Sequence, residues 1–397
     1  MPRLRSPFAD WTRDWTLLAA AVAGVGVFFG VQLTLFNNFI VERLDIEARE
    51  LGWVESLREV PGFLNAFFVA LMIRMAPSLV AAAALAIMGL GLMAYADVGS
   101  VPALILYSLV WSVGFHCWLP MEATLALRFS PAGGKGRWLG QLRAIGSIAM
   151  LVTIGACMLL LDLVNYEGMY LLAGGATVLG GAVLIFASRG HAEVEEKGFV
   201  LKRRYGLYYL LQFLEGCRRQ IFTTFAVFAL VKVHGMPVKT TITLLLINQV
   251  LVTLTAPAVG RLVDLLGERR MLTVGYALLS LVFVGYGLID HRPTLYVLYC
   301  LDNLLFMSGI ALTTYINKIA LAEDLKPTLS MGVTMNHFAA VAVPLLFGTA
   351  WHFFGHRVIF LTAAVLALLS TIASQWVNPA RFAGQDSGSQ EVSGSSG

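Results

Sequence analysis

Three charged residues stand close together in an otherwise apolar stretch that runs from 205 to 233. Glu215 precedes Arg218 by three residues and Arg219 by four, so a helix places all three on one face. One carboxylate neutralises one arginine and leaves the other in need of a partner. Since a guanidinium group offers a planar fork of donors that fits carboxylate or phosphate, this spacing indicates an anion-binding site. Purely structural pairing or a gate is the alternative interpretation.

A second candidate pair lies in two apolar stretches of the first half of the chain. Glu122 and Arg143 are each about six residues from one end of their stretch, which puts them at a similar depth if both stretches are helices. We expect both side chains to bind substrate. A structural ion pair that closes the bundle explains the spacing equally well.

Two glutamates and a histidine are groups that exchange protons. Glu55 and Glu59 are one helical turn apart, and neighbouring carboxyl groups share protons readily. Histidine titrates near neutral pH, which makes His337 a candidate and His116 a weaker one. The alternatives are that the glutamates are solvated at the membrane surface and that His337 is a hydrogen-bonded structural residue. The set expected to couple protons is Glu55, Glu59, Glu122, Glu215 and His337.

Uncharged polar residues within the apolar stretches complete the expected substrate site. Their amide and hydroxyl groups offer the few placed hydrogen bonds that orient a solute in a mostly apolar pocket. The full set expected to bind substrate is Gln32, Asn37, Glu122, Arg143, Glu215, Arg218, Arg219, Asn248, Gln249, Tyr315 and His337.

Other kinds of chemistry leave no pattern in the sequence. The four cysteines lie far apart in apolar stretches and show no metal spacing, so we expect neither a metal site nor a disulfide framework. No phosphate-binding loop of the GxxxxGK[ST] type and no nucleophile elbow is present. We therefore expect no enzyme activity and no cofactor.

The elements that carry these residues are long and apolar. Hydrophobic residues make up 58% of the 397-residue chain and charged residues only 13%, which excludes an ordinary soluble domain. A helix crosses a bilayer with about 20 apolar residues, and in lipid runs of this length are helical because the backbone must satisfy itself. The composition thus predicts an all-α integral membrane protein. Its twelve predicted transmembrane helices are 15–41, 51–73, 78–96, 101–128, 138–163, 168–188, 205–233, 239–263, 271–289, 294–322, 328–354 and 358–378.

A polar gap divides these runs into two sets of six. Lys and Arg concentrate in the segments on the side of the two termini, which places both termini in the cytoplasm. The tail is rich in Gly and Ser, as disordered segments are. The predicted organisation is a cytoplasmic N-terminus at 1–14, a six-helix bundle at 15–188, a central cytoplasmic loop at 189–204, a second six-helix bundle at 205–378 and a disordered cytoplasmic tail at 379–397.

The two halves share a short internal repeat. The segment GVQLTLFNNFIV, which starts at Gly30, aligns without gaps with GCRRQIFTTFAV from Gly216. A weaker match relates Gly140 to Gly332. Two pseudo-symmetric six-helix halves are typical of secondary transporters, which bind substrate near the middle of the membrane. Chance similarity between apolar segments is the alternative.

The connection between the runs 239–263 and 271–289 carries a more specific pattern. It reads GRLVDLLGERR, with Gly260, Asp264, Gly267, Arg269 and Arg270 spaced as in the signature loop of the major facilitator superfamily. The chain resembles this family over about residues 15–378. The resemblance implies a cytoplasmic gate in which the acid meets a helix N-terminus and the basic pair holds the gate closed. The two glycines are expected to allow close packing and a tight turn; a simple cytoplasmic turn is the alternative.

The chain also departs from the family pattern. Leu265 stands where a basic residue usually follows the acid, and the corresponding loop of the first half is reduced to Arg74 and the residues MAPS. The run 138–163 contains glycines but not the Gly-Pro pattern of the family's drug exporters. This absence weakens a drug/proton antiport interpretation.

Charged residues avoid four of the predicted runs. The interiors of 78–96, 168–188, 271–289 and 358–378 contain no Lys, Arg, Asp or Glu. In the family that the chain resembles, the corresponding helices face lipid and the others line the cavity or the interface between the halves. Because charges inside a membrane are costly, those in the other runs are candidates for function.

Together these patterns favour a secondary transporter that moves a small organic solute by alternating access, coupled to protons or another ion. The preference for an organic anion rests on the excess of arginine at 218 and 219. Efflux of a drug or amphipathic cation bound at Glu122 and Glu215 is the alternative, and a membrane sensor or scaffold of the same fold is another. We expect a monomeric multi-pass protein of a bacterial-type cytoplasmic (inner) membrane, in contact with the lipid bilayer and without nucleic acid.

Overall fold

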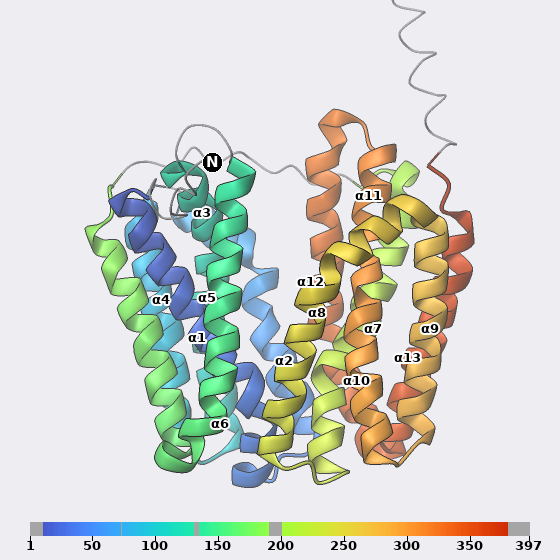
Figure 1. Cartoon of the computed structure of the whole chain (residues 1–397), viewed down its shortest axis with the longest axis horizontal. Helices are drawn as coiled ribbons and strands as arrows, with labels where there is room; N and C mark the ends of the chain where they lie inside the picture. Colours follow the sequence, from blue (N-terminus) through green and yellow to red (C-terminus); the bar gives the residue numbers. More distant parts are fainter. Residues whose placement is uncertain (1–10, 73, 131–134, 190–200, 380–397) are drawn as a thin grey trace, which may run out of the picture. The chain divides into compact units, whose positions relative to one another are not determined.

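The computed structural model describes residues 11–72, 74–130, 135–189 and 201–379, and within these ranges the regular elements are helices without strands (Figure 1). The expectations for the N-terminus at 1–14, the central loop at 189–204 and the tail at 379–397 fall largely outside the described residues. The chain divides into two units. The first comprises Met1–Ile46, Leu57–Val194 and Met236–Leu246, and the second comprises Glu47–Ser56, Glu195–Gly235 and Ile247–Gly397.

The first unit is built around two long helices that pack along each other. These are α1 (Arg13–Leu44) and α6 (Lys135–Ala182), and α4 packs against both α5 and α6. The side chain of Thr12 accepts a hydrogen bond from the amide of Trp15 and so begins α1. The other elements of this unit are the end of α2 (Ala48–Phe63), α3 (Asn65–Met72), α4 (Pro77–Met93), η1 (Ala94–Asp97), α5 (Val101–Phe129) and η2 (Val183–Phe186).

The second unit has α7 (Gly206–Lys232) packed against α12 and α13, and α9 packed against α13. Gly267 and Gly355 have φ angles of 75° and 80° and begin α9 and α13 with turns that suit glycine. The other elements of this unit are the start of α2, η3 (Arg203–Tyr205), most of α8 (Val238–Leu266), α9 (Glu268–Leu288), α10 (Arg292–Phe306), η4 (Met307–Gly309), α11 (Ile310–Ile319), α12 (Ala322–Phe354), α13 (His356–Ala373) and η5 (Ser374–Trp376).

Two predicted runs are interrupted in ways that the sequence did not indicate, and two others carry one helix label. The run 51–73 is split into α2 and α3 at Leu64, three residues after Pro61. The runs 138–163 and 168–188 are two helices, as predicted: both belong to α6, but Asn165, with φ of 57° and ψ of −176°, breaks the helical geometry between them. The run 294–322 is split by the 3₁₀ turn η4, where Gly309 lies against the carboxylate of Glu215.

Nine helices of the described residues are long and apolar enough to cross a membrane, judged by length and composition. One of them, Gly136–Phe186, covers two of the predicted runs. α7 is not among the nine, and it carries Glu215, Arg218 and Arg219 near its centre. The all-α membrane fold is therefore as predicted.

The two glycines that begin the internal repeat, Gly30 and Gly216, both lie where another helix packs closely. A Cβ added to Gly30 of α1 would lie 2.6 Å from the Cβ of Thr153 in α6, and one added to Gly216 of α7 would lie 2.7 Å from Oδ1 of Asn336 in α12. In each unit, the first helix of the predicted half thus approaches the fifth through the matching glycine. The weaker match has no such counterpart, because a Cβ at Gly140 meets no atom within 4 Å while one at Gly332 meets the Tyr208 hydroxyl.

Candidate functional site

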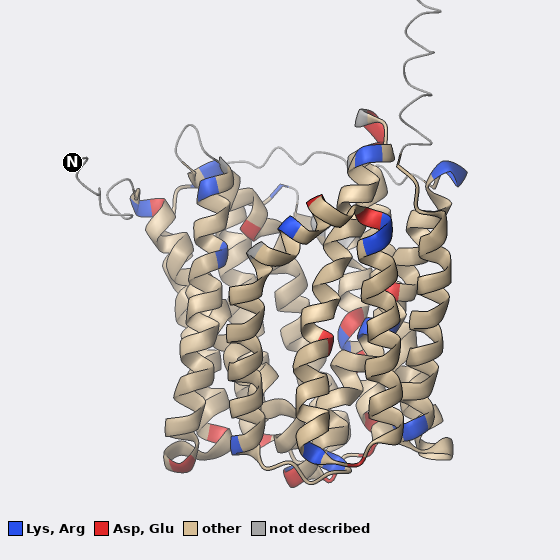
Figure 2. Cartoon of the chain, turned by 45° about the vertical axis from the view of Figure 1, so that its right-hand side comes forward, with Lys and Arg blue, Asp and Glu red and all other residues tan. Residues whose placement is uncertain are grey.

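Charged residues of both signs lie partway along the helices of the second unit as well as at their ends (Figure 2). A cavity of about 80 Å³ opens there between α7, α9 and α10. Its polar groups come from two arginines, one aspartate, one asparagine and one threonine, and three phenyl rings form its apolar wall. The lining residues are Arg218, Arg219, Phe222, Thr223, Phe283, Asp302, Asn303 and Phe306.

The two arginines reach this cavity from adjacent positions on α7 and have different surroundings. Arg218 is 2% exposed, and its guanidinium lies 5.0 Å from the ring centroid of Tyr276 on α9. Arg219 is exposed and lies 4.7 Å from the ring centroid of Phe306 on α10. Both rings hold a guanidinium in place by cation–π attraction without using its hydrogen-bond donors.

Glu215 does not pair with the arginines as the sequence suggested. Its Oε2 accepts a hydrogen bond of 2.8 Å from the hydroxyl of Tyr276, and among the described residues no ion pair within 4.0 Å joins it to Arg218 or Arg219. The charge of Glu215 acts electrostatically on both arginines at a longer range, so the neutralisation of one arginine stays a prediction. The α9 tyrosine offers the buried carboxylate a hydrogen-bond donor of its own.

Arg218 and Asp302 each retain a buried polar atom with unfilled hydrogen-bonding capacity. Nη1 of Arg218 and Oδ1 of Asp302 have no hydrogen-bond partner in the described part of the chain, and Asp302 is 4% exposed. The two side chains interact electrostatically across the cavity that both line. Because buried polar atoms are nearly always satisfied, such a pair indicates a place that a ligand or water fills.

The remaining predicted substrate residues lie outside this cavity. Asn248 and Gln249 lie on α8, Tyr315 is buried on α11, and His337 is half-buried on α12. Oδ1 of Asn248 is buried without a hydrogen-bond partner in the described ranges. The structure thus gathers only Arg218 and Arg219 of the predicted set at the cavity, with Glu215 close behind them.

In the first unit, the predicted residues do not form one cluster. Glu122 on α5 is half-buried and feels the charge of Arg143 on α6, but no ion pair within 4.0 Å joins them among the described residues. Oε1 of Gln32 and Oδ1 of Asn37, both on α1, are buried without a hydrogen-bond partner in the same ranges. The structural ion pair considered for Glu122 and Arg143 is therefore not formed.

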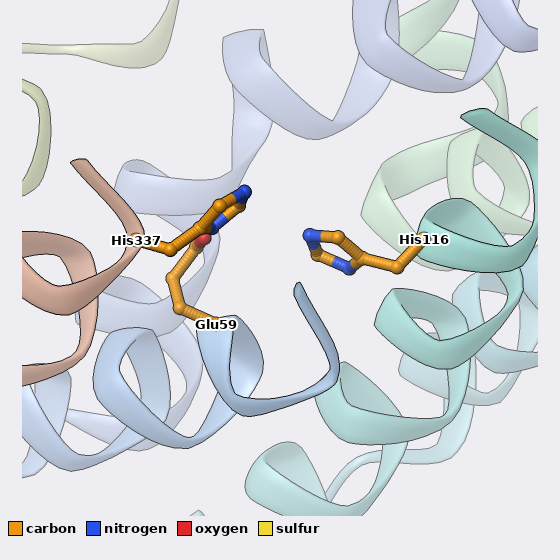
Figure 3. Close-up of side chains that lie close together, drawn as sticks. All are labelled: Glu59, His116 and His337. Atoms are coloured by element: carbon orange, nitrogen blue, oxygen red, sulfur yellow. The ribbon is translucent and has the colours of Figure 1, made fainter. Parts of the chain in front are cut away.

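A polar group in the first unit joins the end of α2 to α5. A carboxylate oxygen of Glu59 and a ring nitrogen of His116 lie within 4.8 Å of each other. Figure 3 draws both side chains. Arg58 pairs with Glu59 at 3.5 Å. The hydroxyl of Ser112 donates to the carbonyl of Arg58 and lies 3.1 Å from Nδ1 of His116. Figure 3 also draws His337, which belongs to α12 of the second unit.

The other glutamate of the predicted proton pair has a different environment. Glu55 lies one turn earlier on α2, in the segment assigned to the second unit, and is 6% exposed. The alternative that both glutamates are solvated at a membrane surface is therefore wrong for Glu55.

The loop between α8 and α9 only partly matches its expected geometry. Gly267 makes the tight turn, with φ of 75°, but a Cβ at Gly260 would meet no atom within 4 Å, so close packing does not explain that glycine. Asp264 is exposed, whereas Glu268 is buried and pairs with Lys318 at 2.5 Å. The loop's ion pair thus comes from the acid that follows Gly267, and its lysine is exposed.

The basic pair of this loop faces the end of the last helix and solvent. Nη2 of Arg269 donates to the side-chain oxygen of Gln375 in η5 at 3.2 Å, while Arg270 is exposed. Gln375 in turn donates to the hydroxyl of Thr273 at 2.9 Å. These bonds connect the start of α9 to the end of α13, and the gate role of the loop stays a prediction.

Sequence reasoning missed three polar members of the cavity. Thr223 was not expected there, and neither were the neighbours Asp302 and Asn303. Their position beside each other inside an apolar run was the signal available. The sequence does not reveal the rotation of α10 about its axis, which turns the side chains of Asp302 and Asn303 toward α7.

Comparisons with known proteins agree with this fold. The sequence profile of the Major Facilitator Superfamily matches residues 16–323 and 208–391, and the chain belongs to that family of membrane transporters. A search among curated protein sequences finds no match. The second profile match begins in α7, where the repeat of the first half begins.

Solved transporter structures share the fold at low sequence identity. The nucleoside transporter NupG has a TM-score of 0.77 and 14% identity, over 92% of this chain and 98% of that one. A bacterial homologue of the human lysosomal transporter Spinster, in an inward-facing and occupied conformation, has a TM-score of 0.74 and 12% identity, over 93% and 97% of the two chains. This chain is accordingly a multi-pass membrane protein with a secondary-transporter fold.

Proposed function

We propose that this protein transports a small organic anion together with protons, and that the acidic group of the anion binds at Arg218 and Arg219. The observation that carries the proposal is that Arg218 lines the cavity while its buried Nη1 has no hydrogen-bond partner in the described ranges. A guanidinium that already stacks on Tyr276 is held in position before the anion arrives. Such preorganisation lowers the ordering cost of binding.

The rest of the cavity suits the carbon skeleton of such an anion. Phe222, Phe283 and Phe306 provide apolar contact, while Asn303 and Thr223 provide polar groups at the same wall. We therefore expect a carboxylate or phosphate group attached to an apolar or aromatic body.

Asp302 gives a physical reason for coupling the anion to a proton. An ionised Asp302 attracts Arg218 and repels an incoming anion, since both carboxylates compete for the same guanidinium. A proton on Asp302 removes this competition and frees Arg218. Proton and anion then bind together, which is the requirement for cotransport.

Glu59 and His116 are a second place where a proton can be held. They lie within 4.8 Å of each other in the first unit, with Arg58 and Ser112 beside them. Histidine and carboxylate exchange a proton readily at near-neutral pH. Glu55, Glu122, Glu215 and His337 stay candidates for the same role.

A neutral aromatic solute is a second candidate substrate. The three phenyl rings and the amide of Asn303 suit an aromatic ring with hydrogen-bonding groups, and NupG is named as a nucleoside transporter. A neutral solute would leave the charge of Arg218 and its unfilled donor, Nη1, without an anionic partner, and we therefore favour the anion.

Thermal stability of the purified protein tests the proposal directly. Ligands that bind only the folded state stabilise it by about 2.7 kcal/mol at a concentration of 100 times Kd. We expect organic anions with an apolar body to raise the melting temperature, and Arg218→Ala and Arg219→Ala to abolish this increase. In vesicles, uptake or efflux of the same anion should be lost in both variants.

Arg128→Ala is the matched control, because Arg128 also stacks on a phenyl ring, that of Phe129, but belongs to the first unit and is not among the residues that line the cavity. It should bind and transport like the wild type. Stabilisation by nucleosides or by amphipathic cations, with none by anions, would contradict the proposal. So would wild-type transport by both arginine variants.

A further inference from the structure

Three side chains that bind metals well meet at one end of the second unit. His234 follows the end of α7, Asp290 lies between α9 and α10, and His356 is the first residue of α13. One ring nitrogen of each histidine and one carboxylate oxygen of Asp290 all lie within 4.8 Å of one another. The two imidazole rings are nearly perpendicular, at 82°, with centroids 6.2 Å apart.

We propose that these three residues bind a divalent transition-metal ion, with Zn²⁺ as the best fit. Two imidazole nitrogens and one carboxylate oxygen are a ligand set that zinc accepts in tetrahedral sites, with the fourth position left for water. Mg²⁺ and Ca²⁺ prefer oxygen ligands throughout, so they fit this set poorly.

The separation of the ligand atoms is compatible with this coordination. Zinc binds histidine nitrogen and carboxylate oxygen at about 2.0–2.2 Å, which places two ligand atoms of a tetrahedral site about 3.4 Å apart. The atoms here, within 4.8 Å of one another, must therefore move together by at most about 1.4 Å. Side-chain rotation supplies a movement of this size, because all three residues lie at helix ends or in connections.

Neighbouring residues hold the ligands in position. Nη2 of Arg357 donates to Oδ2 of Asp290 at 2.7 Å, which fixes the carboxylate and leaves Oδ1 for a metal. The ring of Trp351 lies 5.7 Å from that of His356. Hydrogen bonds of this kind to a ligating carboxylate are common around metal sites and orient the ligand.

Two cations face the cluster and must be counted against metal binding. The charge of Arg357 is offset by its ion pair with Asp290. Arg292, the first residue of α10, lies beside the turn at Gly235 and acts electrostatically on His234. Removal of Arg292 should therefore strengthen metal binding, whereas removal of either histidine should abolish it.

A bound ion would join three connections of one unit. The ligands come from the chain after α7, before α10 and at the start of α13, so a metal crosslinks the helix ends at that side of the bundle. Metal binding should consequently appear as stabilisation of the folded protein.

The experiment uses the purified full-length protein without a histidine tag, stripped with chelator and titrated with ZnCl₂ or, separately, MgCl₂. We expect one Zn²⁺ per chain by calorimetry, a higher melting temperature with ZnCl₂ and no effect of MgCl₂. His234→Ala and His356→Ala should lose the zinc effect. His291→Ala is the matched control, because His291 is adjacent to Asp290 but bonds to Thr294 and is outside the cluster, and it should retain the effect.

Two further measurements keep the test decisive if a histidine variant fails to fold. Co²⁺ bound to the wild-type protein should give the intense visible absorption of four-coordinate cobalt, and Arg292→Ala should bind Zn²⁺ at least several-fold more tightly. The proposal is overturned if the wild type binds no Zn²⁺, if His234→Ala and His356→Ala bind it like the wild type, or if cobalt shows only the weak bands of six-coordination.

Discussion

Arg218 and Asp302 are both buried in the second unit, and each keeps one polar atom free of hydrogen bonds to the described residues. Leaving a buried charge without adequate partners costs about 3–5 kcal/mol in measured cases. Tyr276 lowers this cost by stacking on Arg218 and donating to Glu215 at the same time. The unfilled hydrogen-bonding capacity thus belongs to two residues that line the same cavity.

Asp302→Asn should separate anion binding from proton coupling. The amide resembles the protonated carboxyl group in shape and lack of charge, so the variant should still bind the anion. In the wild type we expect anion binding to weaken as pH rises, and in the variant this weakening should be absent. Exchange of labelled for unlabelled anion across vesicles should continue, whereas accumulation driven by a proton gradient should stop.

Glu122→Gln is the comparison for this prediction, because Glu122 is a candidate proton carrier in the other unit. If Glu122→Gln abolishes gradient-driven accumulation and Asp302→Asn does not, the coupling site is in the first unit. The pH dependence of anion-induced stabilisation, measured in both variants, gives the same distinction without a transport assay.

At the scale of elements, glycine determines how closely the first and fifth helices of each predicted half approach. Gly30 lies against Thr153 and Gly216 against Asn336 and Ala339. Asn336 is itself held, since its Nδ2 donates to the side-chain oxygen of Gln212 on α7 at 3.1 Å. α7, which carries the arginines, and α12 are therefore fixed relative to each other at the level of Gly216, two residues before Arg218.

Gly216→Ala should destabilise the protein by about 1–3 kcal/mol, because a methyl group there would overlap Asn336 and Ala339. Gly140→Ala is the matched control, since a Cβ at Gly140 meets no atom within 4 Å. That substitution should leave stability unchanged or raise it by up to about 1 kcal/mol through helix propensity. Thermal unfolding in detergent measures both, and equal stability of the two variants would contradict the packing argument.

At the scale of the whole molecule, the chain belongs to the major facilitator superfamily and its fold is that of a multi-pass secondary transporter. Its orientation is a prediction from the distribution of Lys and Arg, from which we expect both termini on the cytoplasmic side. The inner-membrane location and the monomeric state also stay predictions.

A fluorescent-protein fusion tests this orientation. Green fluorescent protein attached after residue 397 should fluoresce in a bacterial host, because it folds in the cytoplasm and not when exported through the general secretory route. Alkaline phosphatase at the same position should be inactive, since it needs an oxidising compartment for its disulfides. Active phosphatase together with a dark fluorescent fusion would reverse the assigned sidedness.

The sequence by itself determined the helical class, most helix positions and the existence of a charged centre in the second half. The physical reason is local: an apolar run of about 20 residues has no stable form in lipid except a helix. Glu215, Arg218 and Arg219 stand out in such a run because charges there are costly. The repeat of Gly30 at Gly216 was equally visible, since both glycines occupy the same place in their helices.

Only the tertiary structure decided which side chains meet. Glu215 bonds to Tyr276 and not to the arginines beside it, and Arg218 faces Asp302 on another helix. Likewise, His234, Asp290 and His356 come together from three connections that share no sequence spacing. Helical periodicity gives the face on which a residue lies, but the partner helix, its rotation and its depth are set by packing over the whole unit, which no local pattern contains.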